Sequence, residues 1–220
     1  MNRRAKWLVV GLATIILLSS LTAFYFSIPR SVVRVACVGD SITEGTEYPQ
    51  DLASMLGSNF NVRNFGVGGS TVSLQSDKPY MNQTNFERAI EFSPDIVVIM
   101  LGTNDAYPSR QQGLNNFAKD YEKLIASFQA LSEKPKIYLV LPPPIFNGSL
   151  GPDNTILVQN IIPLIKQVAN ETALPLVDAN TPLLDHADDF WDGVHPKSKA
   201  AKILADEVYD AIRLSIAGWL

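Results

Sequence analysis

Residues 95–105 read DIVVIMLGTND, and this stretch carries the strongest indication of the fold. Residues 95–101 are almost purely apolar and rich in β-branched side chains. This pattern is typical of a strand that is buried on both faces, as in a parallel sheet. The polar sequence GTND follows directly. Because ligands bind beyond the carboxyl ends of strands in open α/β sheets, this junction is an expected place for a functional site.

The segments on either side of this strand alternate between short apolar runs and longer runs with helical spacing. We predict strands over residues 32–38, 61–65, 95–101, 136–141 and 174–177. We predict helices over residues 48–56, 85–92, 113–131, 154–172 and 196–214. Pro163 must either kink the fourth helix or start a new first turn. Five such alternations predict an open, parallel α/β sheet with helices on both faces.

The composition excludes several classes of protein. The chain has 220 residues, of which 46% are hydrophobic and 18% are charged, so it is not a disordered chain. Its single Cys excludes an internal disulfide framework and a multi-Cys zinc site. The formal charge of −4 offers no general basic field for nucleic acid.

The N-terminal segment differs from the rest of the chain. Residues 7–29 carry no charge and follow three basic residues. At about 1.5 Å per residue, a helix of this length approaches the roughly 30 Å thickness of a bilayer core. We therefore predict an anchor or signal segment at residues 1–30 and one folded domain at residues 31–220. The basic flank predicts a single membrane span at residues 7–29 with the domain outside the cytoplasm.

A cleavable signal peptide is the alternative for this segment, and it would release a secreted domain. Its best small-x-small cleavage site, at residues 20–22, is weak because bulky aromatic residues follow it. We therefore favour an uncleaved membrane anchor.

Four polar, glycine-containing motifs lie at the predicted loops: GDSITEG at 39–45, NFGVGGST at 64–71, GTND at 102–105 and DGVHP at 192–196. Ser41 is the candidate nucleophile, at a strand-to-helix turn. A serine hydroxyl needs a base to take its proton before it attacks a carbonyl. Taken alone, Ser41 also fits the role of a helix N-cap.

His195 is the candidate base, because the chain contains only two histidines. Asp192 lies three residues earlier, and in a turn that spacing brings its carboxylate to the imidazole Nδ1. The alternatives are a solvated loop histidine and a turn aspartate. His186 lies in an acid-rich stretch and shows no partner pattern.

A developing oxyanion needs hydrogen-bond donors that are already in place. The backbone amides of Ser41 and Gly69 and the side-chain amide of Asn104 are the candidates. Plain turn roles remain open for Gly69 and Asn104. Asp40 and Trp191, which adjoin Ser41 and Asp192, are candidate substrate contacts, although Trp191 fits a packed core aromatic equally well.

The four motifs, in this order, resemble the SGNH (GDSL-type) hydrolase family over residues 35–205. Ser41 matches the serine of its first block, Gly69 the glycine of its second and Asn104 the asparagine of its third, while Asp192 and His195 match its last block. Gly66 and Gly68 could also supply the second-block amide, and the offset from Asn64 favours Gly69. The resemblance implies a flavodoxin-like three-layer sandwich with strand order 2-1-3-4-5, and ester hydrolysis through an acyl-serine without metal or cofactor.

Residues 78–108 and 141–147 look like those of family members that deacetylate carbohydrates, such as acetylxylan or sialate O-acetyl esterases. The substrate implied is a short acyl ester, in particular acetyl, on a sugar or glycan. The predicted pocket loops, 72–84 and 142–153, contain no long apolar run to hold an acyl chain.

Three alternatives to this function remain open. One is a lysophospholipase or thioesterase on the same scaffold, and another is a catalytically silent glycan-binding module. The third, a metal phosphoesterase using Asp40, Asp192 and His195, lacks a credible set of ligands. The sequence does not indicate an oligomeric state.

Overall fold

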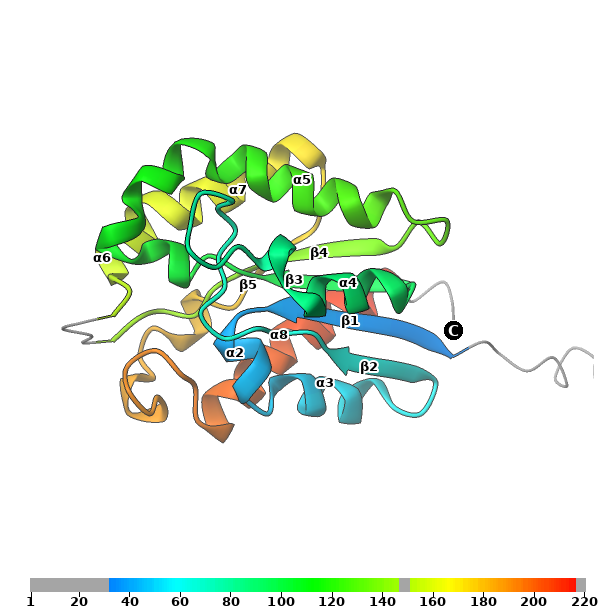
Figure 1. Cartoon of the computed structure of the whole chain (residues 1–220). Helices are drawn as coiled ribbons and strands as arrows, with labels where there is room; N and C mark the ends of the chain where they lie inside the picture. Colours follow the sequence, from blue (N-terminus) through cyan, green and yellow to red (C-terminus); the bar gives the residue numbers. More distant parts are fainter. Residues whose placement is uncertain (1–31, 147–150, 217–220) are drawn as a thin grey trace, which may run out of the picture. The chain divides into compact units, whose positions relative to one another are not determined.

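Five parallel strands form a sheet in the order β2-β1-β3-β4-β5 (Figure 1). The structure is a computed structural model that describes residues 32–146 and 151–216. The strands are β1 (Val33–Gly39), β2 (Phe60–Asn64), β3 (Ile96–Met100), β4 (Lys136–Leu141) and β5 (Leu176–Asp178). Both the parallel sheet and the expected strand order are confirmed.

The central strand β3 is buried along its whole length, as its apolar sequence predicts. Its side chains alternate between two hydrophobic clusters, one on each face of the sheet. Val97 and Ile99 belong to one cluster, and Ile96, Val98 and Met100 belong to the other. Each aliphatic side chain buried in this way stabilises the fold by about 1.5–3 kcal/mol.

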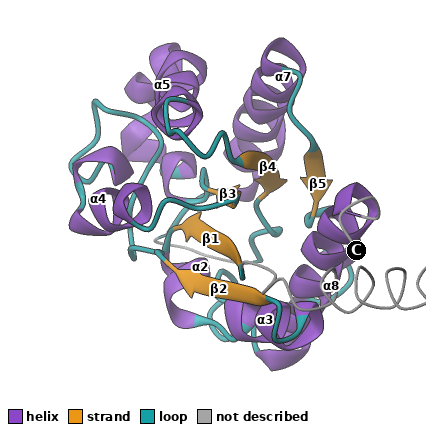
Figure 2. Ribbon diagram, turned by 90° about the vertical axis from the view of Figure 1, so that its right-hand side faces the viewer, coloured by secondary structure: helices purple, strands orange, loops and turns teal. Residues whose placement is uncertain are grey.

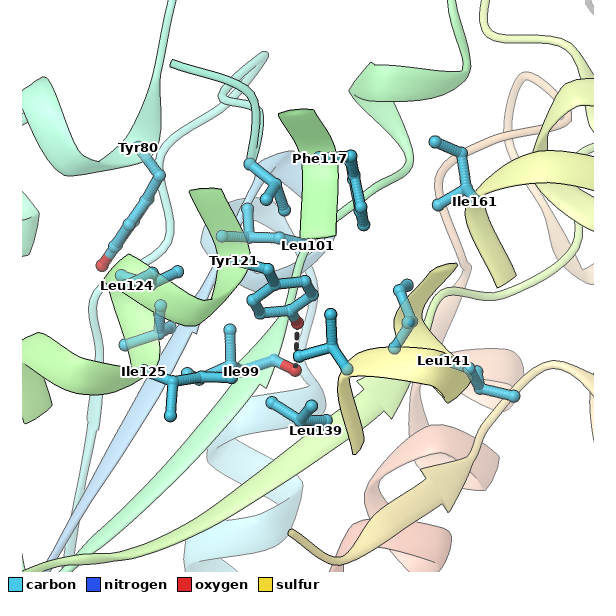
Figure 3. Close-up of a cluster of buried hydrophobic side chains, with 14 of the residues drawn as sticks. Tyr80, Ile99, Leu101, Phe117, Tyr121, Leu124, Ile125, Leu139, Leu141 and Ile161 are labelled. Carbon is cyan, nitrogen blue, oxygen red and sulfur yellow. Dashed lines mark hydrogen bonds between the residues drawn. The ribbon is translucent and has the colours of Figure 1, made fainter. Parts of the chain in front are cut away.

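Helices cover both faces of the sheet (Figure 2). On one side lie α4 (Thr84–Glu91), α5 (Phe117–Gln129) and α7 (Ile162–Thr172). On the other side lie α3 (Tyr48–Leu56) and α8 (Ser198–Ile216). Figure 3 shows the cluster beneath α5 and α7, in which the hydroxyl of Tyr121 donates to the carbonyl of Ile99 at 3.4 Å.

Two predicted helices are interrupted. Residues Pro108–Asn116 form 3₁₀ turns, so α5 begins at Phe117 and not at residue 113. The sequence of these turns has one large apolar side chain and therefore no stripe to pack against the sheet.

The second interruption lies at Pro163. A short helix, α6 (Asn154–Ile156), runs into a π-helical turn at Leu157–Ile161, and α7 follows from Ile162. Pro163 is the second residue of α7, which is a first-turn position, and the Ile162 amide before it donates to the Leu157 carbonyl. The backbone stays helical at Ile161 and Ile162, so the chain passes into α7 through the π turn without a break.

The predicted membrane span at residues 7–29 lies outside the described residues. Among the helices of residues 32–146 and 151–216, none is both long enough and apolar enough to cross a bilayer.

Candidate active site

Ser41 lies at the junction of β1 and the short helix α2 (Ser41–Gly45). The last residue of β1 must be glycine, because a Cβ at Gly39 would come within 2.0 Å of Thr43 Oγ1 and 2.8 Å of the Met100 carbonyl oxygen. Asp40 then caps α2, since its Oδ1 accepts from the Ile42 amide at 2.9 Å. The close packing and the cap hold Ser41 at the carboxyl end of β1.

The loop that contains His195 is fixed by its own aspartate. Asp192 Oδ1 accepts from the backbone amides of Val194, at 3.0 Å, and His195, at 2.9 Å. Gly193 has a φ of +85°, and a Cβ there would lie 1.6 Å from the carbonyl oxygen of Phe146. Phe146 donates its amide to the Gly193 carbonyl at 2.7 Å, so the loop is docked on the segment after β4.

The structure brings the three predicted triad side chains together. Asp192 Oδ2 lies 2.7 Å from His195 Nδ1, and His195 Nε2 lies 2.9 Å from Ser41 Oγ. Ser41 and His195 are 154 residues apart in the chain, so this contact is a product of the fold. Proton transfer from Ser41 to His195 requires this arrangement, with the carboxylate on the opposite ring nitrogen.

The charge of Asp192 suits this role. Partial burial raises the pKa of its carboxyl, but hydrogen bonds from the backbone and ring of His195 outweigh that effect and hold the pKa below its usual range. Asp192 is therefore an anion at neutral pH and can stabilise the imidazolium that forms when His195 accepts a proton.

The glycine-rich loop after β2 leaves one backbone amide for an oxyanion. The Gly66 amide donates to Asn64 Oδ1 at 2.9 Å, and the Gly68 amide donates to Glu44 Oε2 at 2.7 Å. In the described residues no hydrogen-bond acceptor faces the Gly69 amide. Gly69 has a φ of +76°, a conformation that suits glycine. These contacts favour Gly69 over Gly66 and Gly68 as the glycine whose amide is available to an oxyanion.

Asn104 links the loop after β3 to the glycine-rich loop. Its side-chain amide donates to the Ser70 carbonyl at 3.0 Å, and the residue is almost fully buried. Arg110 Nη1 donates to the backbone carbonyls of Asn104, at 3.1 Å, and Gly69, at 3.5 Å. Sequence reasoning missed Arg110, although it joins the two loops that carry the candidate oxyanion donors.

Asp105 adds a second connection between these loops. Its carboxylate oxygens accept from the amides of Val72 and Ser73, each at 2.9 Å. Burial raises the pKa of Asp105 to about 7, against the lowering effect of these two amides and of Arg110. The candidate oxyanion donors therefore lie in loops that are held together by a network of buried hydrogen bonds.

The two candidate substrate contacts, Asp40 and Trp191, differ in exposure. Asp40 is 1% exposed and caps α2, so its carboxylate does not face solvent where a substrate would bind. Burial raises the pKa of Asp40 to about 6, and the Ile42 amide works against that rise. Trp191 is 76% exposed, which excludes the packed-core alternative.

The expectation that His186 has no partner was wrong. Its Nδ1 lies 2.8 Å from Asp189 Oδ2, three residues along the chain. The same spacing that identified Asp192 as the partner of His195 could have identified this pair.

A cavity of about 590 Å³ is lined in part by Arg110, which contacts the loops of Gly69 and Asn104; we refer to these two loops as the oxyanion loops after their candidate role. The remaining lining residues are mostly hydroxyl and amide side chains, with one aromatic and one acidic residue: Ser73, Gln75, Ser76, Asp77, Tyr107, Ser109, Gln112 and Gly113. The predicted loop 72–84 contributes to it, whereas the described residues of 142–153 do not. The 3₁₀ segment supplies the other wall.

The triad does not itself line this cavity. In residues 32–146 and 151–216, no group of three or more His, Cys, Asp or Glu side chains is placed to hold a metal ion.

The fold and the relay from Asp192 through His195 to Ser41 define the class of a serine hydrolase. The chain belongs to the GDSL-like lipase/acylhydrolase family, which it matches over residues 37–203. The resemblance indicated by the four motifs is confirmed.

One curated relative is an acetylxylan esterase from Xylanibacter ruminicola, which is 34% identical over 226 residues. The match covers 90% of this chain and 47% of the relative, so the chain spans about half the length of that protein.

Solved structures with the same fold include an acetylxylan esterase from Geobacillus stearothermophilus and a carbohydrate acetylesterase from Sinorhizobium meliloti. The first, a catalytic mutant, has a TM-score of 0.67 at 24% identity, covering 83% of this chain and 94% of its own. The second has a TM-score of 0.65 at 20% identity, and the match covers 83% of this chain and 99% of that structure's chain. An aryl esterase from M. smegmatis has a TM-score of 0.64 at 20% identity, and the match covers 83% of this chain and 99% of that structure's chain.

Proposed function

We propose that this protein is a serine esterase that removes short acyl groups, in particular acetyl, from carbohydrates through an acyl-serine intermediate. The observation that carries the proposal is the continuous relay in which Asp192 bonds His195 and His195 Nε2 lies 2.9 Å from Ser41 Oγ. Without that contact, Ser41 would be an ordinary helix-terminal serine.

In the first half of the reaction, Ser41 Oγ attacks the ester carbonyl carbon while His195 Nε2 takes the hydroxyl proton. The carbonyl π electrons move to oxygen, and the amides of Ser41 and Gly69 with the side chain of Asn104 stabilise the negative charge. When the intermediate collapses, the C–O bond to the sugar breaks with its electron pair on the sugar oxygen, and His195 returns the proton to that oxygen, so the sugar leaves as an alcohol. Water repeats the sequence on the acyl-serine and releases the acid.

Two features of the chain support a sugar ester as the substrate. The cavity beside the oxyanion loops, which the triad itself does not line, has mainly hydroxyl, amide and charged side chains, and a sugar unit next to the scissile ester would suit it better than an alkyl chain. Trp191 exposes its ring next to Asp192, and an exposed aromatic ring can stack on the apolar face of a sugar.

The relatives agree with this choice, because an acetylxylan esterase and a carbohydrate acetylesterase are among them. A lysophospholipase or thioesterase remains the alternative within the class, and it would need an apolar channel for its acyl chain. A catalytically silent glycan-binding module is disfavoured by the intact relay.

The test is acetate release from acetylated xylo-oligosaccharides, followed alongside hydrolysis of p-nitrophenyl acetate and p-nitrophenyl octanoate. We expect acetate release by the wild-type protein and a preference for the acetyl over the octanoyl ester. Ser41→Ala should lower kcat on the order of 10⁴–10⁶-fold, because the acyl-serine cannot form. A strong preference for octanoate would contradict the sugar-ester proposal, and full activity of Ser41→Ala would contradict the mechanism.

We further propose that residues 7–29 anchor the protein in a membrane with the catalytic domain outside the cytoplasm, where it would meet glycans. The support is the uncharged stretch and the basic residues before it. The mass of the mature protein from the membrane fraction tests this proposal. An intact N-terminus in that fraction supports anchoring, and loss of about the first 20–30 residues indicates a cleaved signal peptide.

A further inference from the structure

The peptide group between Gly68 and Gly69 has a charged partner that the catalytic mechanism does not use. Its N–H belongs to Gly69 and is a proposed oxyanion donor. Its carbonyl belongs to Gly68 and accepts a hydrogen bond from Lys78 Nζ at 2.7 Å. One peptide therefore joins a lysine ammonium to the position where negative charge develops in the reaction.

The loop that carries Lys78 is folded to make this contact. The Thr71 amide donates to the Lys78 carbonyl at 3.1 Å, and the Tyr80 amide donates to the Thr71 carbonyl at 2.9 Å. The loop thereby returns along the glycine-rich segment. The stem of Lys78 lies over Gly69, with its Cδ 3.8 Å from the position that a Cβ of Gly69 would take. Sequence reasoning did not single out Lys78.

Glu44 binds the backbone amide of Gly68, whose carbonyl accepts from Lys78. Its Oε2 accepts from the Gly68 amide at 2.7 Å. A Cβ on Gly68 would lie 3.6 Å from Ser41 Cβ, so this part of the loop is beside the nucleophile. A carboxylate so close would oppose the formation of an oxyanion, and the ammonium of Lys78 supplies the compensating charge.

We propose that Lys78 is a positioning residue of the oxyanion hole, which orients and polarises the Gly68–Gly69 peptide so that the Gly69 N–H binds the transition state more strongly. The proposal rests on ester hydrolysis at Ser41. A hydrogen bond to a peptide carbonyl withdraws electrons from the peptide nitrogen and strengthens its N–H as a donor. Hydrogen bonds from a charged donor are also stronger than neutral ones.

The effect appears in the transition state, where the acyl oxygen carries its charge, and only weakly in the bound ester. Loss of a complete oxyanion donor lowers kcat about 10²–10³-fold. Because the Gly69 amide would remain in place without Lys78, we expect a smaller loss of about tenfold.

The experiment compares Lys78→Met, which keeps the length of the stem but removes the ammonium, with Lys78→Arg, which keeps a charged donor. Lys199→Met is the matched control, since Lys199 Nζ bonds Asp189. With p-nitrophenyl acetate we expect about a tenfold lower kcat for Lys78→Met and a KM within about twofold of wild type. Lys78→Arg should recover most of the activity, and Lys199→Met should retain all of it.

A boronic acid gives a second readout, because it forms an anionic tetrahedral adduct with an active-site serine. Lys78→Met should weaken boronic acid binding by about the same factor as it lowers kcat/KM. Thermal unfolding of each variant shows whether the loop remains folded.

Two results would overturn the proposal: an unchanged kcat for Lys78→Met, whatever its KM, or a loss of activity that tracks the melting temperature and is not recovered by Lys78→Arg. A wild-type protein without esterase activity would instead contradict the proposed function.

Discussion

The two histidines of this protein form similar pairs with very different surroundings. His195 Nδ1 lies 2.7 Å from a carboxylate oxygen of Asp192, and His186 Nδ1 lies 2.8 Å from one of Asp189. In both pairs the partners are three residues apart. The pair at residues 186 and 189 is the less exposed of the two.

The difference lies in what else each pair contacts. His195 Nε2 bonds Ser41 Oγ at 2.9 Å, whereas in the described residues no such partner lies on Nε2 of His186. The carboxylate of Asp189 is shared with Lys199, whose Nζ lies 2.8 Å away. A His–Asp pair is therefore not sufficient evidence of catalysis. A nucleophile on the second ring nitrogen and adjacent oxyanion donors complete the site.

Replacing the two histidines in turn gives the largest expected contrast. His195→Gln removes the base and should lower kcat for p-nitrophenyl acetate on the order of 10⁴–10⁶-fold. His186→Gln should leave kcat within about twofold of wild type, because its ring contacts no reacting group. Comparable losses in both variants, with both proteins folded, would remove the distinction between the pairs.

Replacing Asp192 and Asp189 in turn should give a smaller difference in kcat. Asp192→Asn keeps a similar shape but loses the charge that stabilises the imidazolium, and it favours the wrong tautomer of His195. We expect kcat to fall on the order of 10²–10³-fold, less than in triads with a fully buried aspartate, because the Asp192 side chain is 56% exposed. Asp189→Asn serves as the matched control and should retain wild-type kcat. Wild-type kcat in Asp192→Asn would show that the carboxylate is dispensable.

The smallest effect concerns stability. Hydrogen bonds from Lys199 and His186 hold the pKa of Asp189 below its usual range. An acid with a lowered folded-state pKa stabilises the protein above its unfolded pKa of about 3.9, and this stabilisation is lost as the pH falls through the folded value.

Asp189→Asn should therefore lower the melting temperature by about 1–3 °C at pH 7, and the difference from wild type should shrink below about pH 4. Thermal unfolding followed by circular dichroism from pH 3 to pH 7 measures this change. A difference that stays constant over the whole range would argue against an ionised Asp189 as its cause.

Much of the fold follows from local sequence patterns. The apolar stretch at 95–101 contains β3, and the apolar spacing at 48–56 corresponds to α3. Residues 108–116 and the π turn before Pro163 were not predictable in detail. They depend on contacts between distant segments, as where Gly113 passes so close to Ser73 that a Cβ would lie 2.4 Å from its Oγ.

The candidate site was likewise predictable only in part from local sequence patterns. Ser41, Asp192 and His195 were identifiable because each lies in a short motif after a strand or before a helix. The choice of Gly69 required knowledge of which amides Asn64 and Glu44 already occupy. Lys78 and Arg110 contact the oxyanion loops from separate segments, so no local pattern points to them. The pair of His186 and Asp189 has the same spacing as the catalytic pair, and sequence alone could not distinguish a structural role from a catalytic one.

The most direct test of the central claim is covalent labelling of the folded protein with a fluorophosphonate, with the modified residue located by mass spectrometry. We expect one adduct, on Ser41, which forms at the wild-type rate in His186→Gln and is almost abolished in His195→Gln. An adduct on another serine, or rapid labelling of Ser41 without His195, would contradict the claim that the relay from Asp192 through His195 activates Ser41.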